Sequence, residues 1–370
     1  MIQLAIGAGA GLFLFYLVVK ALGLELGFAF LEGPGGFAFS HRWLTNYDTN
    51  SSRLDAYGVG IINTVRLVAI ALVLTTIVGV FAGIARLSDN WLISRMATLY
   101  VETIRNTPVL IQIVIWYSAV LLPLPRISEA INIFDVFYLS NRSLALPYVS
   151  TGDNFGLWLI VLVAGAVAAI MLRKSLRRRE DRGGGMRHAT FWALALFGVV
   201  AVVSFFITGT PLDPDTPSLK ISEVGILSIQ NGLQVTPEFT AVLLGLVIYT
   251  GAFIAEIVRG GIQALPKGQN EAATALGLNG YQRMTLVILP QALRIIIPPL
   301  TNQFLSLAKN SSLAVAIAFP EIIWVGKTII NNFGHAVPMF IMIFGTYLFM
   351  SLVISVFMNA LNRRVQLAGN

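Results

Sequence analysis

The stretch GGIQALPKGQNEAATALGLNGYQRMTLVILP, residues 260–290, is a polar segment between two long apolar runs. Its pattern predicts two short helices. We expect the first over about residues 268–276, ending at Gly277, since glycine readily adopts the left-handed conformation that caps a helix. Asn279 is expected to cap the second helix, with Gln282 three residues on, at the second position of a capping box. The segment is therefore predicted to be a helical hairpin.

One face of this hairpin carries small side chains around a single carboxylate, Glu271. Such a face suits docking into a groove of another protein. Pro290, with Pro298 and Pro299 beyond it, limits how regularly the chain continues as a helix. The alternative is an amphipathic hairpin that only connects two membrane helices.

Outside the hairpin the composition is that of a membrane protein. Of the 370 residues, 56% are hydrophobic and 12% charged, and the mean hydropathy is +0.76. The apolar residues fall in runs long enough to span a bilayer, which excludes a soluble globular core. Cysteine is absent, which excludes disulfides and thiolate–metal sites. The net charge of +7 comes from basic residues beside apolar spans, which indicates positive-inside topology rather than nucleic-acid binding.

The predicted fold is an all-α polytopic membrane protein with about eight spans. The first apolar run has no basic n-region and no clear cleavage site, so we interpret it as a retained helix rather than a signal peptide. The seventh is expected to be broken by its prolines and again by a polar run. The expected spans are residues 2–24, 60–87, 96–122, 155–172, 189–208, 238–258, 291–318 and 337–361.

The segments between the spans divide by charge. Residues 27–57 are too polar to span and are expected to be interfacial or loop. Residues 123–154, with a short amphipathic piece at about 131–139, and 209–237 are expected to be external loops. The basic residues lie in three loops and the tail, at Arg86 and Arg95, Arg173–Arg187, Arg259–Arg294 and Arg363–Arg364. With eight spans these fall on one side, so both termini and the 260–290 hairpin are predicted to be cytoplasmic.

Catalytic machinery is not apparent. The sequence has no GxxxxGK[ST] phosphate loop, and no G-x-S-x-G elbow that would support a nucleophilic serine. The three histidines, His41, His188 and His335, are scattered without metal-ligand spacing. We therefore expect this chain to bind no cofactor and to depend on another subunit for energy.

Polar residues inside the third span carry a first functional signal, because such groups are costly in a membrane unless they face a partner or water. The run Arg105–Gln112 reads RNTPVLIQ. Pro108 frees the carbonyl of residue 104, and Gln112 lies four residues on, on the same helix face. Thr107 and Gln112 either contact a transported ligand or bind helices together, and Arg105 is expected to pair with Glu102 one turn back.

A second signal is the polar run Lys309-Asn310-Ser311-Ser312 inside the seventh span. A broken membrane helix exposes amides and a positive dipole end, which suits a carboxylate. These four residues either line a transport path or form a kink held by local hydrogen bonds. Nearer the hairpin, Glu256 and Arg259 are expected to pair at helical spacing in a structural role.

The motifs resemble those of one family. E-A-A, three residues, Gly, nine residues and I-x-L-P is the pattern of the EAA loop of ABC importer permeases, and this chain differs only in Val287 where Ile is usual. YVETIRNTPVLIQ is similar to the third-helix signature of polar amino-acid permeases, and Lys309–Leu313 matches K-[DN]-[ST]-S-L. The resemblance implies ATPase coupling for Gly268, Glu271, Ala272, Ala273, Leu276, Gly277 and Pro290. It implies a place in the substrate path for Thr107, Gln112, Lys309, Asn310, Ser311 and Ser312.

The resemblance extends over nearly the whole chain beyond residue 57. The extra fourth and fifth spans, NRSLALP at 141–147 and MNALNRRV at 358–365 are similar to the Q-type permease of general L-amino-acid importers and to a glutamate/glutamine/aspartate/asparagine permease. The implied fold is a type I importer core with additions. Its expected parts are an N-terminal helix and interfacial segment (1–56), the core (57–122 and 238–362, with the coupling loop at 260–290) and an insertion of external loops and two helices (123–237).

The resemblance also implies partners. These are a second, M-type permease, two ATPase subunits that bind ATP and Mg, and a periplasmic amino-acid-binding protein, in a bacterial inner membrane. The transported substrates are expected to be L-amino acids, of broad or acidic and amide specificity. An ion-coupled secondary transporter is the alternative, since it also uses broken helices, but it leaves the 260–290 hairpin unexplained.

Overall fold

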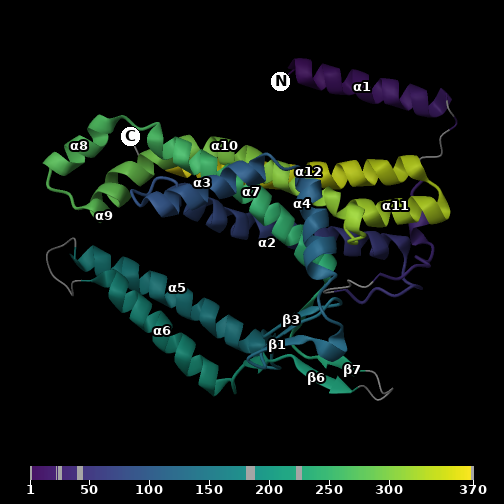
Figure 1. Cartoon of the computed structure of the whole chain (residues 1–370), viewed down its shortest axis with the longest axis horizontal. Helices are drawn as coiled ribbons and strands as arrows, with labels where there is room; N and C mark the ends of the chain where they lie inside the picture. Colours follow the sequence, from purple (N-terminus) through teal and green to yellow (C-terminus); the bar gives the residue numbers. More distant parts are fainter. Residues whose placement is uncertain are drawn as a thin grey trace. The chain divides into compact units, whose positions relative to one another are not determined.

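The computed structural model describes residues 2–21, 23, 27–39, 45–180, 188–221 and 227–367 (Figure 1). The chain forms two compact units, one of residues 1–123 with 236–370 and one of residues 124–235. The second unit starts and ends close to the boundaries expected for the insertion.

Six helical segments in the described part of the chain are long and apolar enough to cross a membrane. A seventh is added if the bent pair α3 (Trp91–Arg105) and α4 (Val109–Ile115), with the π-turn η2 (Trp116–Leu121), counts as one span. The six are α2 (Arg53–Ala85), α5 (Phe155–Glu180), α6 (Ala189–Ile207), α7 (Pro237–Gln263), the segment Gly280–Ile317 and α12 (Ala336–Leu367).

The first expected span corresponds to α1 (Ile2–Ala21). Within it the apolar stretch Gly11–Lys20 is too short to cross a membrane by itself, and residues 22 and 24 lie outside the described residues. Membrane crossing by α1, which would bring the number of spans to eight, therefore stays a prediction.

The second span begins seven residues earlier than expected, at Arg53. Ser52 accepts a hydrogen bond from the Asp55 backbone N–H (3.0 Å), and the Asp55 carboxylate accepts one from the Ser52 backbone N–H (3.1 Å). This capping box starts the helix before the apolar run, since it satisfies backbone donors that the helix leaves open.

α2 packs closely against α7 through small residues. A Cβ at Gly79 would lie 2.5 Å from the Ile254 Cβ, so only glycine allows this approach. Between the two helices the buried Thr75 hydroxyl donates to the Val247 carbonyl (3.2 Å). Small residues and a hydroxyl bond are the usual contacts between membrane helices, where lipid removes the hydrophobic driving force.

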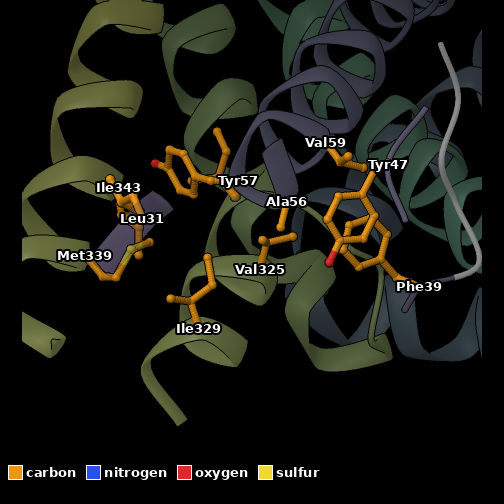
Figure 2. Close-up of a cluster of buried hydrophobic side chains, with 11 residues drawn as sticks. Leu31, Phe39, Tyr47, Ala56, Tyr57, Val59, Val325, Ile329, Met339 and Ile343 are labelled. Atoms are coloured by element: carbon orange, nitrogen blue, oxygen red, sulfur yellow. The ribbon is translucent and has the colours of Figure 1, made fainter. Parts of the chain in front are cut away.

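Residues 27–57, expected to be interfacial or loop, contain η1 (Ala29–Glu32) and irregular chain that packs onto the core (Figure 2). The Phe39 and Tyr47 rings stack with centroids 5.0 Å apart, and both side chains are buried. Their cluster includes Val325 and Ile329 of α11 (Ile322–Phe333), a helix that the sequence analysis did not predict. Residues 40–44 lie outside the described part.

The second unit contains the expected helix pair α5–α6 and, against the all-α prediction, eight short strands. The amphipathic piece at 131–139 is a β-hairpin, since Ile131 pairs with Leu139 and Ile133 with Phe137 across a turn at Phe134 and Asp135. η3 (Ile127–Glu129) precedes it. The basic run reaches into α5, and its residues 181–187 lie outside the described residues. One sheet has four strands in the order β1 (Ile131–Ile133), β2 (Phe137–Leu139), β3 (Leu144–Leu146) and β8 (Leu233–Val235). A second sheet pairs β4 (Tyr148–Thr151) with β5 (Leu212–Asp215). A third pairs β6 (Ser218–Ile221) with β7 (Leu227–Gln230).

Candidate functional site

The first arm of the 260–290 segment is α8 (Lys267–Ala275), which ends as predicted. Gly277 has φ +76°, the left-handed conformation that glycine adopts without steric cost. The Gly277 N–H donates to the Thr274 carbonyl (2.9 Å) and the Leu278 N–H to the Ala273 carbonyl (3.2 Å). This pair of bonds is a Schellman cap, which satisfies the last carbonyls of the helix and turns the chain sharply.

The second arm begins with the predicted capping box. The Asn279 side chain accepts from the Gln282 N–H (2.9 Å), and the Gln282 side chain accepts from the Asn279 N–H (3.1 Å). The arm continues as α9 (Gly280–Arg283), the π-turn η4 (Met284–Ile288) and α10 (Leu289–Asn310), with Pro290 in the first turn of α10. Proline is tolerated there because the first turn has no intrahelical acceptors for its N–H groups.

Side-chain bonds tie the two arms together. Arg283 donates to the Thr274 hydroxyl (2.9 Å), and Gln291 donates to the Gln269 amide oxygen (3.0 Å). Ala273 is buried in the angle between the arms. In Figure 1 the hairpin of α8 and α9 projects beyond one end of the other helices of its unit. The segment can therefore move as one body.

The predicted coupling residues lie on both sides of this hairpin. Ala273 faces inward, whereas the other six are exposed, and the Leu276 side chain is 80% exposed. Tyr281, 79% exposed, adds an aromatic ring that the motif did not single out. Exposed apolar side chains beside one carboxylate, Glu271, form a surface of the kind that a partner protein covers.

At the base of the hairpin, Glu256 is the acceptor for three arginines. It forms short ion pairs with Arg86, at the end of α2, and with Arg259, as predicted, and Arg105 lies 3.9 Å away. The predicted Arg105–Glu102 pair is wrong. α3 ends at Arg105 beside α7, so the guanidinium reaches Glu256 and lies 5.1 Å from the Phe253 ring.

The third span was predicted as one segment, residues 96–122, but a bend of 104° separates its two helices. Pro108 lies three residues beyond the end of α3 and cannot donate the backbone hydrogen bond that would continue the helix. The buried Gln112 amide donates to the carbonyls of Ile104 (3.0 Å) and Thr107 (2.9 Å) at the break. The Ile104 carbonyl also accepts from the Thr107 N–H (3.2 Å). Thr107 itself donates to the Thr103 carbonyl (2.9 Å). The Gln112 side chain therefore stabilises the geometry of this break.

Replacing Gln112 by leucine is expected to lower the free energy of unfolding by about 2 kcal/mol, since two hydrogen bonds are lost and, in the described part of the chain, only the Ile104 carbonyl keeps a backbone donor, the Thr107 N–H. Thr107→Val is the matched control, because it removes one bond of equal length at an exposed hydroxyl that water replaces. Thermal unfolding of the purified protein in detergent measures both. Equal melting temperatures for the two variants would contradict this role of Gln112.

The seventh span also differs from its prediction. α10 runs unbroken through Pro298 and Pro299, which membrane helices tolerate when neighbouring groups satisfy the freed carbonyls. The change comes at Ser311, where the α-helix becomes the 3-10 helix η5 (Ser311–Ile317).

Local hydrogen bonds hold this second polar run. The hydroxyls of Ser311 and Ser312 donate to the carbonyls of Ala308 and Lys309, both at 2.7 Å. Lys309 is exposed and Asn310 half-buried. η5 contacts α4, so the fold brings the helix of Gln112 and the turn of Ser311 together.

Glu321 was missed by the sequence analysis, although an acidic residue in the apolar run AFPEIIW is the kind of residue that marks a site. It lies between the span that ends at Ile317 and the one that begins at Ala336, and is fully buried. Its carboxylate accepts from the backbone N–H groups of Ile323 (2.9 Å) and Trp324 (2.8 Å). Burial raises the pKa of Glu321 to about 7, although these bonds and one from Tyr347 oppose the shift.

In the described part of the chain no three His, Asp or Glu side chains gather at metal-binding distance. His41 lies outside it.

Comparison with known proteins gives consistent matches. A family profile described as "Binding-protein-dependent transport system inner membrane component" matches residues 75–367. The chain is 42% identical to the "General L-amino acid transport system permease protein AapQ" of Rhizobium johnstonii, covering 92% of this chain and 84% of that protein. It is 39% identical to the "Putative amino-acid ABC transporter permease protein YhdX" of Escherichia coli K12 (93% and 86% covered). It is 34% identical to the "Glutamate/glutamine/aspartate/asparagine transport system permease protein BztB" of Rhodobacter capsulatus (95% and 88%).

Proposed function

The chain belongs to the family of inner membrane components of binding-protein-dependent transport systems, and from this membership we propose that it is the permease subunit of an ATP-driven importer of L-amino acids. It is a multi-pass protein of the bacterial inner membrane. ATP and Mg are bound by partner subunits, and this chain contributes the path and the coupling surface.

The observation that carries the proposal is the tied hairpin of α8 and α9. Its arms are joined by the Arg283–Thr274 and Gln291–Gln269 bonds, so a force on its exposed face moves the start of α10. Glu271, Ala272 and Leu276 offer that face to a cleft of an ATPase subunit. Closure of the ATPases on ATP then moves the spans through the hairpin as a lever.

We assign the substrate path to the two breaks that contact each other. Broken helices inside a membrane place polar groups where a zwitterion needs them, with amides and dipole ends for its carboxylate. The proposed lining residues are Thr107, Gln112, Lys309, Asn310, Ser311 and Ser312. AapQ and BztB carry names for general and for acidic and amide amino-acid transport, which supports broad or acidic and amide specificity here.

The proposed complex contains a second permease of the M type, two ATPase subunits and a periplasmic amino-acid-binding protein. We propose that both termini and the hairpin lie in the cytoplasm. The positive-inside rule supports this side for the basic residues of α5 and the Arg363–Arg364 tail.

Co-purification of the tagged chain from solubilised membranes tests the proposal. We expect an ATPase and a second permease to be recovered, and ATP hydrolysis to be stimulated by binding protein loaded with an amino acid. Binding protein without ligand is the control. A lone chain with ion-driven uptake and no ATPase would contradict the proposal, and recovery of only one permease type would replace the M-type partner by a second copy.

A further inference from the structure

Glu321 is a fully buried carboxylate whose partners are hydrogen-bond donors rather than cations. Every salt bridge in the described part of the chain involves Glu256, and none involves Glu321. Besides its two backbone bonds, Glu321 accepts from the Tyr347 phenol of α12 (2.9 Å). A carboxylate that is buried between two spans without a cation is costly, and such residues in membrane proteins mark functional positions.

Tyr347 links this carboxylate to α12, and backbone hydrogen bonds link it to η5. The Glu321 N–H donates to the Phe319 carbonyl (2.8 Å), and the Phe319 N–H donates to the Ala314 carbonyl (3.2 Å). Ala314 lies in η5, the 3-10 turn that opens at the fully buried Ser311. A continuous set of hydrogen bonds therefore runs from Tyr347 through Glu321 to η5.

Two residues of α2 hydrogen-bond to the chain between η5 and α11. Ala318 adopts a left-handed φ of +58°, which is unfavourable for alanine and needs support from its surroundings. The Asn63 amide donates to the Pro320 carbonyl (3.0 Å), and the Thr64 hydroxyl accepts from the Ile322 N–H (3.2 Å). Irregular backbone inside a membrane protein is tolerated only when its polar groups are satisfied in this way.

We infer that Glu321 and Tyr347 form a positioning pair, which fixes the turn η5 and the start of α11 relative to α12 and thereby sets the shape of the substrate path. The inference rests on the proposed function only for its consequence in transport. The contacts themselves are testable in the isolated chain.

Tyr347→Phe is the discriminating variant, because it removes the bond from α12 to Glu321 and leaves both backbone bonds of Glu321 intact. Tyr57→Phe is the matched control. The Tyr57 side chain is buried, whereas that of Tyr347 is half-buried, and the Tyr57 phenol bonds Thr346 of α12 at 2.9 Å. No hydrogen bond joins it to Glu321 or Ser311 in the described part of the chain. Tyr57 and Tyr347 are the titratable groups that face Glu321 from α2 and α12.

The first measurement is hydrogen–deuterium exchange of the purified chain in detergent. We expect Tyr347→Phe to raise exchange across residues 318–324 about tenfold, the equivalent of one lost hydrogen bond to a charged group, and Tyr57→Phe to leave that segment unchanged. Equal exchange in both variants would overturn the inference. This measurement does not depend on what the protein transports.

The second measurement is amino-acid uptake by proteoliposomes of the assembled complex, as a function of pH. The ionised Glu321 carboxylate, which accepts all three bonds, prevails above about pH 7, so wild-type uptake is expected to fall as the pH drops below that value. Tyr347→Phe removes a donor to the charged form, so its midpoint moves to higher pH and its maximal rate falls about tenfold. Glu321→Gln loses the pH step.

Identical pH profiles for Tyr347→Phe and wild type would overturn the positioning role in transport. Absence of wild-type uptake for every amino acid, with exchange behaving as expected, would instead reject the proposed function and leave the positioning pair standing.

Discussion

Replacing Glu271 by lysine is expected to reduce amino-acid uptake at least tenfold while the complex still assembles and hydrolyses ATP. Glu271 is exposed on α8 and is the only carboxylate of the hairpin, so the fold does not depend on it. A lysine here would meet a partner surface that is complementary to a carboxylate, and such a like-charge contact costs several kcal/mol. Movement of the ATPase is then no longer transmitted to the hairpin.

Uptake by membrane vesicles, together with ATPase activity of the purified complex, measures this separation. Glu129→Lys is the matched control, since it makes the same charge change on an exposed residue of the second unit. We expect the control to retain uptake. Normal uptake by the Glu271→Lys complex would reject the lever, whereas loss of assembly would show that Glu271 holds the subunits together rather than coupling them.

The hairpin was predictable because its determinants are local. The left-handed glycine at 277 and the Asn279–Gln282 capping box act within a few residues of the sequence, so their spacing alone places both helix ends. The apolar runs likewise predicted the membrane helices, since each must satisfy its own backbone in lipid.

What could not be predicted depends on contacts between distant residues. Arg105 has a possible partner one turn away in Glu102 and an actual one in Glu256, 151 positions later, and only the bend at Pro108 decides between them. The importance of Glu321 likewise depends on Tyr347 of α12 and on burial, which its neighbours in sequence do not reveal.

The strands of the second unit were missed for a related reason. They are three or four residues long, and two of the pairings join distant segments, Leu144 with Val235 and Tyr148 with Asp215. Runs this short do not show a clear twofold alternation, so turn residues and polar composition predicted loops instead.

Removing the Glu256 carboxylate with Glu256→Ala is expected to lower the free energy of unfolding by about 3 kcal/mol. The side chain balances three arginines from α2, α3 and α7, and it is 28% exposed, so the cost lies at the low end for a broken buried pair. Without it, Arg86, whose side chain is only 11% exposed, keeps a charge that neither water nor a partner stabilises. The arginines also repel one another, which loosens α3 from α7 at the base of the hairpin.

Denaturation of the purified chain in detergent, monitored by circular dichroism, measures this effect. Glu102→Ala is the control, because that exposed glutamate forms no ion pair in the described part of the chain, and a change within about 0.5 kcal/mol is expected. Adding Arg86→Met to Glu256→Ala is expected to restore part of the loss, since an apolar side chain of similar length removes the uncompensated charge. If Glu256→Ala costs no more than Glu102→Ala, the arginines are stabilised by other groups, and Glu256 is not what holds α2, α3 and α7 together beside the hairpin.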